Sequence, residues 1–93
     1  MSREFSLKSK GWELTCRDDI TQGMMVEYNE KLLKAGNVRG VALNGAVVKA
    51  AVACGWIESP EALDVDAASP AMVGWIAGKV TDIIREAIDI PPE

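Results

Sequence analysis

One segment of low charge limits how this chain can fold. Between residues 37 and 55 the sequence reads NVRGVALNGAVVKAAVACG, and Lys49 is the only charged residue after Arg39. On a helical wheel one apolar stripe contains Leu43, Val47, Ala50, Ala51 and Cys54, and a second contains Val41, Val48 and Val52. A helix that is apolar on two sides is either central in its domain or shared with a partner. We therefore predict a helix over 41–54, with Val41, Val48 and Val52 as candidates for contact with another protein.

The N-terminal residues alternate in polarity, which is typical of a strand with one buried face. Two such runs surround Lys10-Gly11, and together they predict a β-hairpin over about 3–16. A two-residue loop at Lys10-Gly11 matches every cross-strand pair in polarity, and these pairs are Leu7 with Leu14, Phe5 with Cys16, and Lys8 with Glu13. An isolated hairpin is marginally stable, so its apolar face is expected to lie on the helices.

Two further helices are predicted on either side of the central one. The first spans about 19–35, begins at a capping Asp18 or Asp19 and ends at Gly36. It carries Met24 and Met25, whose flexible side chains suit varied partners.

The last helix spans about 70–88, because Ser69-Pro70 is a strong start signal. Residues 56–69 are interpreted as an acidic linker, and 89–93 as an extended tail ending in Pro91-Pro92. The fold class expected for residues 1–93 is a single α+β domain, mostly α, in which the hairpin packs on three main helices.

The stretch CGWIESP marks the end of the central helix. Gly55 is its predicted stop, and a Schellman-type end folds a following apolar residue back on the last turn. We expect Ile57 to make that internal contact and Trp56 to lie nearer the rim, available to a partner. Trp75 falls among polar residues of the last helix, so it is either a second contact candidate or a cover for the edge of the hairpin.

Composition excludes several classes of function. The formal net charge is −4, and residues 41–93 carry three Lys/Arg against eight Asp/Glu, which disfavours nucleic-acid binding. The chain has no histidine, the usual general base and metal ligand, and its two cysteines do not match a zinc pattern. We therefore expect no enzyme activity, no metal and no cofactor. No membrane span or leader segment is apparent, so a cytoplasmic, unprocessed protein is expected.

Several of these pieces resemble small proteins of the tail gene clusters of long-tailed bacteriophages, of the tail assembly chaperone kind. They are Gly55-Trp56-Ile57 with Pro60, the acidic Val65-Asp66, the helix over 71–87 with Trp75, and the closing Pro91-Pro92-Glu93. The resemblance implies a non-enzymatic protein of the host cytoplasm, absent from the mature virion. It implies a tape measure protein as the client, whose long apolar helices the chaperone covers, and a tail tube protein as a possible second partner.

Two other functions remain open. A small homo-oligomeric structural or adaptor protein would pack Val41, Val48 and Val52 on a symmetry mate. A regulatory DNA-binding domain would use the two helices joined by GNVRG at 36–40, although the acidic balance of the chain opposes it.

Overall fold

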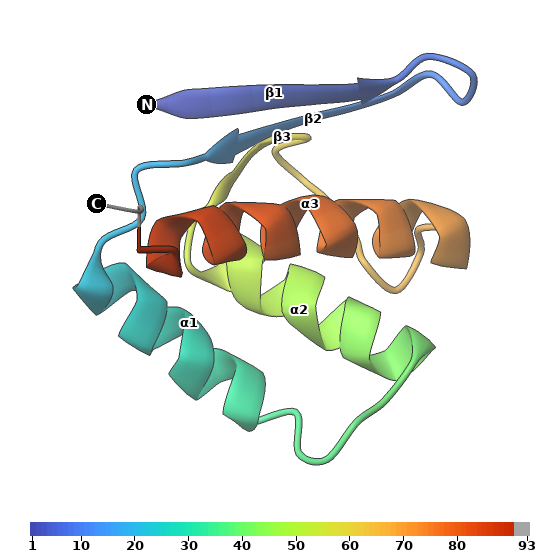
Figure 1. Cartoon of the computed structure of the whole chain (residues 1–93). Helices are drawn as coiled ribbons and strands as arrows, with labels where there is room; N and C mark the ends of the chain where they lie inside the picture. The colour runs from blue at the N-terminus through green and yellow to red at the C-terminus, as the bar shows by residue number, and fades with distance from the viewer. Residues whose placement is uncertain (91–93) are drawn as a thin grey trace.

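The N-terminal hairpin forms two strands of a three-stranded antiparallel sheet of order β1-β2-β3 (Figure 1). The computed structural model describes residues 1–90. Strand β1 (Ser2–Leu7) pairs with β2 (Trp12–Arg17). The hairpin is confirmed, and the α+β, mostly helical fold class is confirmed with it.

The register of the hairpin differs from the expected one by two residues. Phe5 faces Leu14 and Leu7 faces Trp12, so the loop contains four residues rather than two. A two-residue hairpin turn needs positive φ at its first central position, which here would be Lys10. The longer loop leaves only Gly11 at positive φ, at 68°. Because side chains alternate with period two, the shift leaves the same residues on each face.

Strand β3 (Ile57–Ser59) lies within the stretch interpreted from sequence as a linker. It pairs antiparallel with β2, placing Ile57 beside Cys16 and Ser59 beside Thr15, with an irregularity between the two pairs. The amide of Arg17 also donates to the carbonyl of Trp56 at 2.8 Å. The second edge of β2 is therefore paired, and residues 56–69 are not a linker throughout.

Helix α1 (Gln22–Leu33) starts later than the sequence indicates. Its N-cap is Thr21, whose hydroxyl accepts a hydrogen bond from the Met24 amide at 3.2 Å. Neither expected cap is used: Asp18 lies 3.7 Å from the Arg3 guanidinium, and Asp19 accepts two hydrogen bonds from the Arg17 guanidinium, at 3.0 and 3.2 Å. Ion pairs thus replace the predicted cap.

Helix α2 (Val41–Ala53) ends in a Schellman motif. The Gly55 amide donates to the Val52 carbonyl and the Trp56 amide to the Ala51 carbonyl, both at 3.0 Å. Gly55 has φ of 74°, a conformation that glycine adopts without strain. The predicted helix and its stop are both confirmed.

Helix α3 (Pro70–Ile88) also matches its prediction. The Ser69 hydroxyl accepts a hydrogen bond from the Met72 amide at 3.2 Å, and Pro70 occupies the first turn. Asp89 and Ile90 follow without regular structure. The rest of the predicted tail, including Pro91-Pro92, lies outside the described residues.

The helices are stacked away from the sheet. Figure 1 shows the sheet above α3 and α2 beneath α3. Helix α1 lies against α2, on the side away from the sheet. The side chains buried between these layers are Leu14, Cys16, Tyr28, Val48, Ala50, Ala51, Trp56, Val73, Ile76, Ala77, Val80 and Ile83. The core thus draws on the sheet and on all three helices, and it leaves the outer faces of α1 and α2 toward solvent.

Candidate protein interface

The thiol and phenol groups of the core have environments that suppress ionisation. Burial, and secondarily the charge of Glu58, raises the pKa of the Cys16 thiol to about 11. Burial is also the main cause that raises the pKa of Cys54, with Glu27 second, and the pKa of Tyr28. Raised pKa values leave these groups neutral at pH 7, so neither cysteine is an activated nucleophile.

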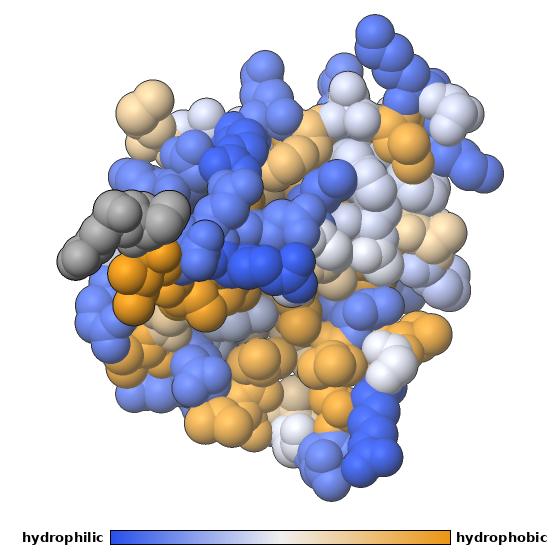
Figure 2. Space-filling view, in the orientation of Figure 1, coloured by the Kyte–Doolittle hydropathy of each residue, from blue (hydrophilic) through white to orange (hydrophobic). Residues whose placement is uncertain are grey.

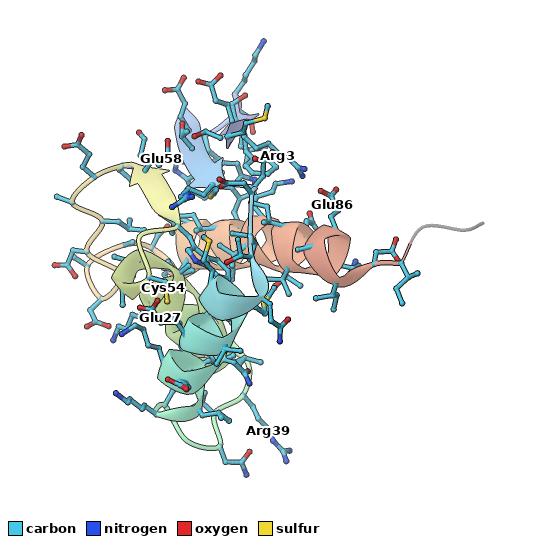
Figure 3. The ribbon with its side chains drawn as sticks, turned by 90° about the vertical axis from the view of Figure 1, so that its left-hand side faces the viewer. Arg3, Glu27, Arg39, Cys54, Glu58 and Glu86 are labelled. Carbon is cyan, nitrogen blue, oxygen red and sulfur yellow. The ribbon has the colours of Figure 1, made fainter. Side chains whose placement is uncertain are left out.

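The acidic residues make no recognisable metal site. Within residues 1–90, no group of three or more Cys, Asp or Glu side chains is placed to hold an ion. Several carboxylates are instead paired with arginine. Arg3 contacts Glu86 at 2.6 Å, which ties β1 to the end of α3 (Figure 3), and the hydrogen bonds from Arg17 lower the pKa of Asp19 to about 2. These pairs connect elements of the fold.

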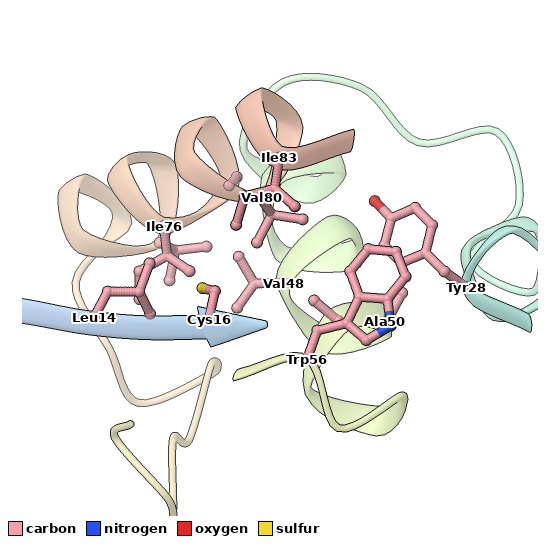
Figure 4. Close-up of a cluster of buried hydrophobic side chains, with 12 residues drawn as sticks. Leu14, Cys16, Tyr28, Val48, Ala50, Trp56, Ile76, Val80 and Ile83 are labelled. Atoms are coloured by element: carbon pink, nitrogen blue, oxygen red, sulfur yellow. The ribbon is translucent and has the colours of Figure 1, made fainter. Parts of the chain in front are cut away.

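Trp56 is a core residue, so its predicted place at the rim is wrong. Its side chain is 2 % exposed and stacks on Tyr28 with ring centroids 4.6 Å apart (Figure 4). The physical reason lies in the helix end. In a Schellman motif the apolar contact comes from the second residue after the C-cap, and that residue is Trp56, because Cys54 is the C-cap. Ile57 is only half-buried.

Val48 is likewise buried, with no exposed surface. Figure 4 shows it among Ile76, Val80 and Cys16, between the sheet and α3. Val48 therefore contributes to the fold and is not free to contact a partner. The second apolar stripe of α2 is therefore buried at Val48 but open to solvent at its start, where Val41 is 67 % exposed.

Most of the other predicted contact residues are intermediate in solvent exposure. Trp75 packs against Trp12 with ring centroids 5.9 Å apart, which matches the alternative in which it covers the hairpin. Met24, Met25 and Val52 are half-buried against the core. Of the seven candidates, only Val41 presents most of its side chain to solvent.

The exposed large hydrophobic residues gather on the helical half of the molecule. Apart from Met1, those in the described part of the chain are Val26, Leu33, Val41, Leu43, Ile88 and Ile90. They lie on α1, at the start of α2 and around the end of α3. Figure 2 shows hydrophobic side chains grouped over this lower half, while the sheet side is more polar. We call these six residues the apolar patch.

Of the six residues of the apolar patch, only Val41 was predicted from the sequence to contact a partner. Leu43 belongs to the stripe expected in the core, yet it is 40 % exposed, because α2 buries its later residues Val48, Ala50 and Ala51. Val26 and Leu33 are seven residues apart on α1, and therefore lie on one face of the helix. That seven-residue spacing is the feature of the sequence from which an apolar face of α1 could have been predicted.

A groove runs along the outer face of α2. Its main hollow, of about 560 Å³, lies between α2, the connector after α1 and the start of α3. Adjoining hollows of about 430 and 350 Å³ continue toward residues 62–66 and toward the end of α1. All three include Lys49 in their lining. We call this surface the α2 groove, and its floor on α2 consists of Val41, Ala42, Gly45, Ala46, Lys49, Ala50, Val52 and Ala53.

No family model, curated protein or solved structure matches this chain. Function therefore has to be inferred from the residues and their arrangement. In the described part of the chain, no helix combines the length and the apolar character needed to cross a bilayer.

The arrangement is suited to contact with another polypeptide. An apolar patch and an open groove lined by small residues allow a helix to approach α2 closely, since the separation of packed helices depends on the side chains between them. The candidate site for such contact is the outer surface of α1, α2 and the end of α3.

Proposed function

We propose that this chain is a non-enzymatic tail assembly chaperone of a bacteriophage, which binds apolar helical segments of a tape measure protein in the host cytoplasm. The observation that carries the proposal is the confinement of the apolar patch to one half of the molecule, next to the α2 groove. A protein that keeps apolar helices dispersed needs such a surface, and helix-in-groove docking is the natural mode.

The charge of the chain supports the same role. A net charge of −4 on 93 residues favours solubility of a complex whose client is hydrophobic. Half-buried Met24 and Met25 lie on α1 beside the patch, and methionine adapts to partners of varied shape. In this proposal the chaperone leaves before the virion matures, and a tail tube protein is its second partner.

Co-expression tests this function. The chain is expressed with the tape measure protein of its own gene cluster, and the soluble fraction of that client is measured. We expect the client to become soluble with the native chain and with Ser9→Glu, a charge change in the hairpin loop. We expect Leu33→Glu, which puts the same charge into the apolar patch, to lose the effect. A client that is equally insoluble with and without the chain would reject the proposal.

Self-association is the second candidate, because Val41 and Leu43 are both exposed in the first turn of α2. The version that pairs Val41, Val48 and Val52 across a symmetry axis is wrong, since Val48 is inaccessible. Light scattering at several concentrations distinguishes the two functions. A fixed monomeric mass at high concentration would remove this candidate.

A further inference from the structure

The α2 groove has an unusual distribution of charge. Residues 31–57 contain four Lys/Arg and no Asp or Glu, while the remaining six Lys/Arg and all fourteen Asp/Glu lie elsewhere in the chain. This one segment therefore carries +4 in a chain of net charge −4. Of its cations, Lys31, Lys34 and Lys49 line the hollow between α1 and α2.

The opposite wall of the groove has the reverse charge. Residues 58–69 contain four Asp/Glu and no Lys or Arg, and Asp64 and Asp66 line the hollow beside the end of α2. The groove thus lies between a basic wall on the α1 side and an acidic wall on the side of residues 62–66.

Lys49 connects the two walls. Its ammonium lies 2.9 Å from a carboxylate oxygen of Asp66. The two side chains are 56 % and 80 % exposed, and ion pairs that are so exposed contribute little stability. The contact does not prevent a ligand from lying on α2.

We propose that the α2 groove binds an amphipathic helix whose polar flank is acidic. Small and apolar residues of that helix would lie on Ala42, Gly45 and Ala46, and its acidic flank would face Lys31 and Lys34. The inference rests on the proposed function and adds to it which client segments are bound. The floor from Ala42 to Ala53 is roughly 16 Å long, which corresponds to about three helical turns.

The chemistry of the groove favours a helix over other occupants. An extended peptide would lack backbone partners there, because the backbone of α2 is already hydrogen-bonded within its own helix, whereas a bound helix satisfies its own groups. A nucleic acid would bring phosphates toward Asp64 and Asp66 as well as toward the lysines. Two copies packed through their α2 floors would place Lys49 near a second Lys49.

The test uses synthetic amphipathic helices of about 15 residues, long enough to cover the groove. Three labelled peptides share one alanine and leucine face and carry glutamate, glutamine or lysine on the polar flank. Fluorescence anisotropy with the full chain measures each dissociation constant. We expect the glutamate peptide to bind at least tenfold more tightly than the lysine peptide at low salt, and the difference to shrink as salt screens the charges.

Two matched pairs of variants locate the site. Lys34→Glu should weaken binding of the glutamate peptide at least fivefold, and Lys8→Glu, the same change in the hairpin loop, should not. Ala42→Leu fills the groove and should weaken all three peptides, whereas Ala87→Leu on exposed α3 should not. Both substituted alanines are exposed helical residues, and circular dichroism verifies that each variant is folded.

Several results would overturn the inference. They are equal binding of the three peptides, equal effects of Lys34→Glu and Lys8→Glu, tighter binding of a DNA duplex than of the glutamate peptide, or a dimer that Ala42→Leu dissociates. Equal binding of all three peptides would leave the helix-binding function intact. Conversely, a clear preference for the acidic flank together with an insoluble tape measure protein would reject only the proposed chaperone function.

Discussion

At the scale of single residues, the pair Trp56 and Ile57 shows how one position in a helix end changes a side chain's role. Trp56 fills the space between α2 and α1 and stacks on Tyr28. Its burial is nearly complete even though, in the described structure, its indole Nε1 has no hydrogen-bond partner. An unpaired buried donor is destabilising, so the apolar contact of the ring outweighs that loss.

This division of roles predicts unequal effects of truncation. Trp56→Ala should lower the free energy of unfolding by about 3–5 kcal/mol, because it empties a buried site. Ile57→Ala should lower it by about 1 kcal/mol, since that side chain is already half in water. Urea unfolding of both variants measures the difference, and similar losses in the two would contradict the structure.

The cysteines should differ in reactivity toward a thiol reagent. Cys16 is 1 % exposed and its pKa is raised to about 11, so at pH 8 it is both inaccessible and protonated. Cys54 is half-buried. We expect a disulfide exchange reagent to modify Cys54 slowly and Cys16 only after unfolding in urea, with the modified residue identified by mass spectrometry. Rapid modification of Cys16 in the native protein would show that β2 opens readily.

At the scale of elements, the end of α2 and the start of α3 were more predictable than strand pairing or the start of α1. Ser69-Pro70 and Gly55 act through their own backbone and side-chain atoms, and both form the expected helix boundaries. Strand β3 has only three residues, too few to show alternation. It exists because the chain leaves the Schellman turn beside the free edge of β2, which is a tertiary relation.

Gly55, just after the end of α2, and Gly78, inside α3, should respond oppositely to replacement by alanine. Gly55→Ala should destabilise the protein by about 1–2 kcal/mol, because φ at this position is 74° and a Cβ is strained there. Gly78→Ala should stabilise it by about 0.5–1 kcal/mol, since Gly78 lies inside α3 and its added Cβ meets no atom within 4 Å. Thermal unfolding of the two variants shows whether each substitution raises or lowers stability. A more stable Gly55→Ala variant would argue against the Schellman motif.

At the scale of the whole molecule, the exposed large hydrophobic side chains of residues 2–90 lie on or beside the helices and not on the sheet. Ion pairs tie the sheet to the end of α3, and the helical half carries the apolar patch. Side chains that do not contribute to the core can be changed without loss of the fold. In the proposed function, this separation lets a hydrophobic partner bind while the molecule remains folded.

Replacing Val26, Leu33, Leu43 and Ile88 together by glutamine tests that separation. Because these side chains are 40 to 70 % exposed, the free energy of unfolding should fall by at most about 2 kcal/mol in total. Binding of the dye ANS to the native protein should drop by more than half. A loss of cooperative unfolding in the quadruple variant would place these residues in the core instead.

The sequence by itself determined the hairpin, the three helices, the stop at Gly55 and the start at Ser69-Pro70, because alternation, capping and positive φ act over a few residues. It determined little of the interface. Only the tertiary structure decided that Val48 and Trp56 are buried and that Leu33 and Leu43 are exposed, since burial depends on which elements pack against each face. The lysines and aspartates that flank the α2 groove come from segments up to 35 residues apart, and folding alone places them on opposite walls.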